Sequence, residues 1–275
     1  MSDVPVYTGK IRNLENILTG LGSAVVAYSG GVDSTFLARI AYDTLGGTAL
    51  AITAVSPSLA ASELEDAKAL AAQIGIRHVL IHSNELSDAR YLANRADRCY
   101  FCKHEVYGLL VNYAREHGLQ AVLDGTNVDD LRDPRPGRKA AREHGVLSPL
   151  ADAGFTKAEI REASRSLGLP TADKPSMACL SSRIPYGTPI SIESLKQIEE
   201  AERLLRGLGL GQLRVRHHRD TARIEVDPGD FPVVIERRHE IVEGLKALGY
   251  VYVALDLEGY RTGSMNKALK IPNGR

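Results

Sequence analysis

The sequence predicts an α/β protein: a doubly wound parallel sheet followed by a smaller α+β domain. Three observations lead to this prediction. Between about residues 20 and 150, short apolar runs alternate with longer amphipathic runs. Glycines follow the amphipathic runs at Gly46, Gly75 and Gly118, as they commonly follow helices. Beyond residue 188, two alternating runs follow each other across a short turn, which indicates an antiparallel hairpin.

The four apolar runs of the first part are expected to be strands that lie parallel in one sheet. Helical patterns separate them, so each connection is a crossover and helices cover both faces of the sheet. The expected strands are 23–29, 48–56, 77–83 and 120–126. The expected helices between them are 34–46, 61–75 and the stretch that contains Cys99 and Cys102.

Periodicity fails in segment 128–145, which has two prolines and many charges. We expect a mobile loop over the carboxyl edge of the sheet, where open α/β sheets bind ligands. A solvated linker is the alternative. Helix 156–168 follows, because Thr156 and Glu159 have the spacing of a capping box.

A domain boundary is expected near residue 188, which gives domains of residues 1–187 and 188–275. The second domain is expected to contain a helix at 191–207, strands 212–218 and 222–227, a helix at 231–249 and a strand at 250–257. We interpret His217 and His218 as surface residues at a strand end.

Composition excludes several classes of protein. The chain has 34 basic and 34 acidic residues, so it lacks the net positive charge that is typical of nucleic-acid binders. Its first residues, MSDVPVYTGK, show no targeting pattern, and no apolar run approaches the roughly 18 residues of a membrane span. The chain has three cysteines, a sparse and odd number that does not suit a disulfide framework. Their number favours reduced thiols and a cytoplasmic location.

The stretch AVVAYSGGVDSTFLA, which begins at Ala24, indicates a phosphate-binding loop. An apolar strand leads into Ser29, Gly30 and Gly31, whose backbone N–H groups can approach an anion, and then into the positive N-terminus of a helix. The lysine of a Walker A motif is missing, and the pattern is not G-x-G-x-x-G. An ordinary glycine-rich turn is the plainer alternative.

The run Ser29-Gly30-Gly31-Val32-Asp33-Ser34 resembles the pyrophosphate-loop ATPases, which split ATP into AMP and pyrophosphate. The resemblance implies that the chain activates a carboxylate or carbonyl by adenylation. It also implies that Asp33 helps to hold Mg²⁺, a cation that prefers oxygen ligands. In this superfamily Ser56 would lie near adenine; a helix cap is the alternative for that serine.

The three thiols need a separate explanation. Cys99 and Cys102 form a C-x-x-C pair, and Cys179 lies far along the chain. The pair alone fits a redox couple, a zinc site completed by His104, or inert buried cysteines. Three thiolates with one vacant corner suit a 4Fe-4S cluster whose fourth iron stays open.

Three segments together resemble the LarE family, the ATP-dependent sulfur transferases of nickel-pincer nucleotide biosynthesis: DRCYFCKHEVYGLL, LDGTNVDDLRDPRPGRKAAREHGVLSPL and KPSMACLSSRIPYG. The resemblance implies that residues 1–187 bind ATP and that residues 188–275 serve the substrate. That substrate would be pyridinium-3,5-biscarboxylic acid mononucleotide, whose carboxylates become thiocarboxylates.

Two branches of that family differ in the source of sulfur. In one, a single cysteine, matching Cys179, gives up its own sulfur. In the other, three cysteines hold a 4Fe-4S cluster that carries a further sulfide. The presence of Cys99 and Cys102 resembles the cluster branch, which needs a sulfide donor as partner. A homo-oligomer is also expected.

A phosphorylated dicarboxylate requires cations in its pocket. The candidates are Arg183 beside Cys179, Lys103 beside Cys102, and Arg214 with Arg216 on one strand face. The family resemblance adds three further residues, Ser182, Glu202 and Glu225. Solvated surface residues are the alternative for each charge.

Three other functions fit parts of the pattern. A tRNA thiolase of the 2-thiocytidine type also combines a pyrophosphate loop with cluster cysteines, but the neutral charge balance argues against it. An amide-forming ATPase such as NAD or GMP synthetase has no use for three thiols. A nucleotide-binding sensor would release no pyrophosphate.

Overall fold

The computed structural model describes residues 7–131, 136–175 and 178–261. The chain forms two compact units, one of residues 1–85 with 99–177 and one of residues 86–98 with 178–275. This division falls at 177/178, whereas the sequence predicts a boundary near 188. Segment 86–98 belongs to the second unit although it lies within the first unit in chain order, which no local sequence pattern predicts.

The first unit contains the predicted parallel sheet. Its strands are β1 (Ala24–Ala27), β2 (Ala49–Val55), β3 (Arg77–His82) and β4 (Ala121–Leu123), in the order β3-β2-β1-β4. The chain adds strands to one side of β1 and then crosses to its other side. The carboxyl ends of β1 and β4 are therefore neighbours at the switch point, where such sheets bind ligands.

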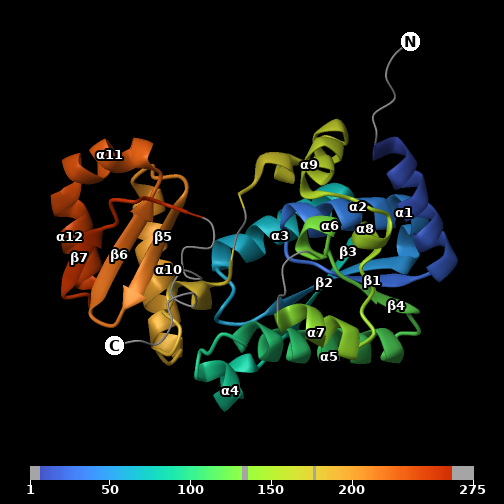
Figure 1. Cartoon of the computed structure of the whole chain (residues 1–275), viewed down its shortest axis with the longest axis horizontal. Coiled ribbons are helices and arrows are strands. Elements are labelled where there is room, and N and C mark those ends of the chain that lie inside the picture. The colour runs from blue at the N-terminus through green and yellow to red at the C-terminus, as the bar shows by residue number, and fades with distance from the viewer. Residues whose placement is uncertain (1–6, 132–135, 176–177, 262–275) are drawn as a thin grey trace, which may run out of the picture. The chain divides into compact units, whose positions relative to one another are not determined.

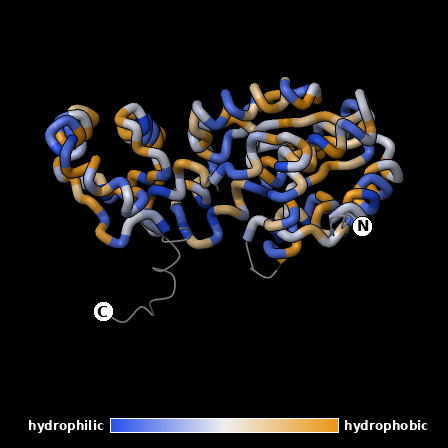
Figure 2. Tube along the Cα trace, turned by 90° about the horizontal axis from the view of Figure 1, so that it is seen from above, coloured by the Kyte–Doolittle hydropathy of each residue, from blue (hydrophilic) through white to orange (hydrophobic). Residues whose placement is uncertain are grey.

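Helices pack on both faces of this sheet (Figure 1). One face is covered mainly by α1 (Tyr7–Leu21), α2 (Val32–Leu45), α3 (Ala61–Ile74), α8 (Pro149–Asp152) and α9 (Lys157–Ser166). The other is covered by α5 (Arg98–Glu116) and α7 (Pro136–Glu143). Hydrophobic and hydrophilic segments alternate along the helices (Figure 2), as expected for elements with one face on a core.

The prediction of a mobile loop at 128–145 is wrong for its described residues. They form α6 (Val128–Leu131) and α7. Proline is tolerated in the first turn of a helix, and α7 begins at Pro136. Ala140 and Ala141 are buried, and they pack this short, highly charged helix against the sheet. Two small apolar residues among many charges give no clear hydrophobic periodicity, so the sequence does not predict the helix.

In the second unit, β5 (Leu213–His218) and β6 (Thr221–Val226) form the predicted antiparallel hairpin, and β7 (Tyr252–Leu255) pairs parallel to β6. The unit also contains α4 (Ala89–Leu92), α10 (Ile192–Gly207), α11 (Phe231–Glu236) and α12 (Arg238–Ala247). Short 3₁₀ turns complete the chain at 46–48, 85–87, 170–173, 180–183 and 228–230.

The single helix predicted at 231–249 is wrong, because the chain breaks between α11 and α12. Arg237 lies at the break, and its guanidinium donates to the Leu208 carbonyl oxygen at 3.2 Å. Gly244 allows α12 to approach α10: a Cβ there would lie 2.4 Å from Leu204 Cδ1. Among the described residues, no helix is both long enough and apolar enough to cross a membrane.

Candidate active site

The predicted phosphate loop joins β1 to α2. Gly30 has φ +69°, and a Cβ there would lie 3.0 Å from the Ala67 backbone, so only glycine fits without strain. The N-cap of α2 is Gly31, which brings no side chain over the helix end. The Ser34 hydroxyl lies between Ser29 and the Gly31 carbonyl oxygen, at 3.1–3.3 Å, and holds the loop in shape. The backbone N–H groups at this helix end can therefore face an anion.

Asp33 in the first turn of α2 has two partners that the sequence analysis missed. Lys157, the first residue of α9, forms an ion pair with its carboxylate, and Asn127 Nδ2 donates to it at 3.3 Å. Gly125 permits this approach, since a Cβ there would lie 3.1 Å from both Asp33 Cβ and the Ser34 nitrogen. Their positions in the sequence could have indicated a role at this site. Asn127 follows the fourth apolar run, and Lys157 follows the helix cap at Thr156.

Asp124 directly follows β4, beside this loop, and is buried. Its carboxylate accepts hydrogen bonds from the hydroxyls of Tyr107, Thr126 and Ser148 at 2.8–3.0 Å. Burial raises the pKa of Tyr107 to about 12, so the phenol keeps its proton. The Lys103 ammonium lies 5.0 Å from the centroid of the Tyr107 ring. The pKa of Lys103 is raised above its ordinary value, and the neighbouring Tyr107 is the largest cause.

Ser56 lies just past β2 and turns toward protein rather than solvent. Its hydroxyl donates to Glu85 Oε1 at 2.5 Å, and the Ser58 hydroxyl reaches the same oxygen at 2.9 Å. The Ser58 nitrogen also donates to Ser56 Oγ at 3.2 Å, as in a serine turn. Glu85 is only 2% exposed. These contacts show a structural role for Ser56, and its predicted place beside adenine stays a prediction.

The three cysteines are divided between the units. Cys99 and Cys102 lie one turn apart in the first turns of α5, the former exposed and the latter half-buried, and Cys179 is exposed in the second unit. None of them is in a disulfide bond. Across residues 7–131, 136–175 and 178–261, no group of three or more His, Cys, Asp or Glu side chains is arranged to hold a metal ion. The shared cluster therefore stays a prediction.

Arg183, four residues after Cys179, is almost wholly buried against Glu202 of α10. Its Nε and one Nη donate to the two carboxylate oxygens at 2.8 and 2.9 Å. The other Nη donates to the Cys179 carbonyl oxygen at 3.0 Å and to Ser182 Oγ at 3.2 Å. Burial would raise the pKa of Glu202, but the hydrogen bonds and charge of Arg183 outweigh it and lower that pKa. The ion pair thus holds the Cys179 segment on the second unit.

Arg214 and Arg216 lie on one face of β5, as predicted. Arg216 donates to Glu225 Oε2 at 2.7 Å and to the Ser182 carbonyl oxygen at 2.9 Å, and Arg223 donates to Glu225 Oε1 at 3.0 Å. Burial and then the charge of Arg183 lower the pKa of Arg214, so its cationic form is electrostatically strained. An anion beside Arg214 would relieve that strain.

Arginines and carboxylates form one cluster in this unit. Ion pairs join Arg183 and Arg206 to Glu202, and Arg216 and Arg223 to Glu225. Arg214 lies close to both Arg183 and Glu202. Most of these groups are buried, and the forked guanidinium groups of arginines suit a ligand with negative charge.

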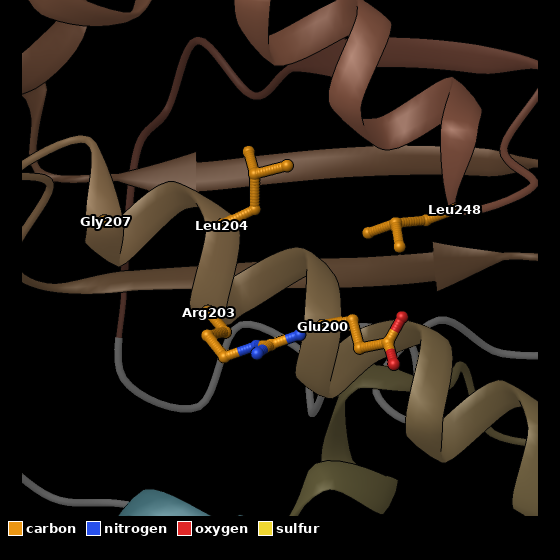
Figure 3. Close-up of a pocket in the computed structure, with 5 residues that line it drawn as sticks. All are labelled: Glu200, Arg203, Leu204, Gly207 and Leu248. Atoms are coloured by element: carbon orange, nitrogen blue, oxygen red, sulfur yellow. The ribbon is translucent and has the colours of Figure 1, made fainter.

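A separate shallow hollow lies on the outer side of α10. It is lined by Glu200, Arg203, Leu204, Gly207 and Leu248 (Figure 3). The charged ends of Glu200 and Arg203 point away from the two leucines in that view. It contains none of the predicted site residues, so we do not assign the active site to it.

Comparisons with known proteins identify one matching family model and several relatives. A family model described as asparagine synthase matches residues 23–179, which include the phosphate loop and all three cysteines. An uncharacterised protein of Synechocystis is 49% identical over 94% of this chain and 98% of its own length. The pyridinium-3,5-bisthiocarboxylic acid mononucleotide synthase of Lactiplantibacillus plantarum is 39% identical over 94% of this chain and 95% of its own. A tRNA-specific 2-thiouridylase of Synechococcus is 30% identical, but over 60% of this chain and 53% of its own length.

Proposed function

We propose a function from the premise that the chain belongs to the LarE family of ATP-dependent sulfur transferases, within the pyrophosphate-loop ATPases. The reaction is the conversion of the carboxylates of pyridinium-3,5-biscarboxylic acid mononucleotide to thiocarboxylates, at the cost of ATP. The observation that carries this proposal is the glycine-lined end of α2 beside Asp33 and Lys157. The short coverage of the tRNA thiolase does not favour that alternative.

The first step is adenylation, and the first unit supplies its groups. A substrate carboxylate oxygen bonds to the α-phosphorus of ATP, and the bond between that phosphorus and the bridging oxygen breaks to release pyrophosphate. Backbone N–H groups at Gly30 and Gly31 would hold the departing phosphates. Lys157 would neutralise their charge, and the Asp33 oxygens suit the Mg²⁺ that accompanies ATP. Ser29, Ser34 and Ser56 support the loop and the neighbouring strand end.

The second step replaces AMP by sulfur at the activated acyl carbon. Its residues would be Cys179 and the cations of the second unit. Lys103, close to Cys102 in the first unit, stays a further predicted substrate cation. We assign the substrate phosphate to Arg214 and Arg216, because these two arginines lie buried on one face of β5 within the arginine cluster. Glu202 and Glu225 hold the arginines in place, and Ser182 contacts Arg183.

The thiols fit a 4Fe-4S cluster in donor type. Cys99 and Cys102 are one helical turn apart, none of the three thiols is in a disulfide, and two of them are exposed. When bound, such a cluster would supply the sulfide for transfer. Reduced thiols are also the basis for proposing a cytoplasmic protein, and a homo-oligomer remains part of the proposal.

A count of turnovers distinguishes the two sulfur sources. With ATP, Mg²⁺, sulfide and substrate, the reconstituted wild-type protein should form more than one thiocarboxylate per chain. A cluster can be reloaded from the added sulfide after each transfer, whereas a cysteine can give up its sulfur only once. Cys99→Ala should lose both the cluster absorbance and multiple turnover. If Cys179 instead loses the mass of hydrogen sulfide after one turnover while Cys99→Ala stays active, Cys179 is the sacrificial donor.

Arg214→Ala tests the assignment of the phosphate. Loss of one charge-assisted contact should weaken mononucleotide binding about ten- to a hundredfold, measured by calorimetry without ATP. Arg203→Ala is the matched control, since Arg203 is exposed on α10 at the separate hollow. Equal affinities of Arg214→Ala and wild type would place the phosphate elsewhere.

A further inference from the structure

The prediction that His217 and His218 are surface residues at a strand end is wrong for His217, which is buried, and His218, the last residue of β5, is half-buried. Side chains alternate along a strand, so His218 shares a face with Arg214 and Arg216. The opposite face contributes Leu213 and Val215 to the hydrophobic core of the unit. His217 also lies there, buried, with Nδ1 3.2 Å from the Tyr250 hydroxyl.

The Nε2 atom of His218 is shielded from solvent, yet it has no hydrogen-bond partner within residues 7–131, 136–175 and 178–261. Buried ring nitrogens normally have a partner, since leaving one unsatisfied is costly. The neighbouring His217 follows this rule. An orphaned nitrogen next to an arginine cluster therefore points to a missing ligand atom.

The charges around His218 come from both strands of the hairpin. Arg216 and His217 are on its own strand, Arg223 and Glu225 are on β6, and Thr221 is its cross-strand partner. Burial, then Arg223 and Arg216, lower the pKa of His218, and Glu225 opposes them weakly. The imidazole is therefore neutral near pH 7. A neutral imidazole can donate one N–H without adding to the repulsion among the arginines.

We propose that His218 is a binding residue for the phosphate of the substrate, which it contacts through Nε2–H beside Arg216. This inference rests on the proposed function. The arriving phosphate would bring up to two negative charges beside the ring. Those charges favour the imidazolium form, so binding should be accompanied by proton uptake.

The experiment measures binding by calorimetry at pH 7 without ATP, so no chemistry takes place. The ligands are pyridinium-3,5-biscarboxylic acid mononucleotide and the corresponding riboside, which lacks the phosphate. Buffers of different ionisation enthalpy report the protons taken up. The variants are His218→Ala, His218→Gln, which keeps a neutral donor near the Nε2 position, and His239→Ala, an exposed histidine on α12 as control.

His218→Ala should bind the mononucleotide about ten- to a hundredfold more weakly and the riboside as wild type does. His218→Gln should recover most of the affinity but take up no proton, and His239→Ala should match wild type. Unchanged mononucleotide affinity in His218→Ala, or an equal loss for the riboside, would overturn the role of His218 while the proposed function stands. If wild type binds neither ligand, the proposed substrate is wrong and this inference fails with it.

Discussion

Asp33→Ala is expected to lower the rate of substrate-dependent pyrophosphate release by about a hundred- to a thousandfold. Asp33 lies in the first turn of α2, at the end that carries the bare glycine loop, and it is bound to Lys157 and Asn127. Its removal takes away the carboxylate proposed for Mg²⁺. It also releases the lysine that would face the phosphates. The measurement is pyrophosphate release at saturating ATP and substrate.

Asp43→Ala is the matched control for this loss. Asp43 is on the same helix and is also paired with a cation, Arg39, at 2.7 Å, but it lies in the last turn, away from the loop. It should leave the rate unchanged. Since the Asp33 side chain is partly exposed, Asp33→Ala should unfold at nearly the wild-type temperature. Products of ADP and phosphate from wild type, or a wild-type rate in Asp33→Ala, would contradict the assigned role.

Glu202→Gln is expected to destabilise the second unit by about 3–5 kcal/mol. The glutamine has nearly the same shape but removes the charge that compensates Arg183, and both side chains are at most 1% exposed. The variant also weakens the acceptor for the Val215 nitrogen, at 3.1 Å, and for Arg206, at 3.0 Å. Urea unfolding followed by circular dichroism measures the free energy of unfolding.

The stability difference between wild type and Glu202→Gln should depend on pH. The pKa of Glu202 is lowered in the folded protein, whereas the unfolded value is about 4.3. The stability that Glu202 contributes is therefore fully present above that unfolded value and is lost as the pH falls through the lower folded value. The difference between wild type and Glu202→Gln should be constant from pH 6 to 7 and should shrink in acid.

Glu240→Gln provides the control for the charge change itself. Glu240 pairs with Arg237 at 2.7 Å in the same unit, but both side chains are exposed, so the variant should change the free energy of unfolding by less than about 1 kcal/mol. A Glu202→Gln protein as stable as the control would show that Arg183 finds another partner. If the difference in free energy of unfolding between wild type and Glu202→Gln stayed unchanged at low pH, the charge of Glu202 would not be the cause of that difference.

Local sequence patterns were sufficient for much of the fold. The four strands of the first unit, the capping box at Thr156 and the hairpin of β5 and β6 are confirmed, since each depends on a short run of residues. Two wrong predictions, the loop at 128–145 and the single helix at 231–249, concern features that depend on tertiary contacts. Helix α7 depends on two buried alanines against the sheet, and the break at Arg237 depends on a contact with Leu208. Neither contact leaves a periodic signal.

The sequence by itself determined the phosphate loop, because a strand, two glycines and a helix N-terminus form a local unit whose geometry follows from backbone sterics. It also determined that Arg214 and Arg216 share a strand face. Only the tertiary structure decided what these charges do. Asp33 meets Lys157, and Arg183 meets Glu202, across separations in the chain that no local pattern encodes. Burial then separates the two pairs: Arg183 and Glu202 are at most 1% exposed, so removing either charge leaves the other buried and uncompensated, whereas Asp33 and Lys157 are partly exposed and contribute little to stability.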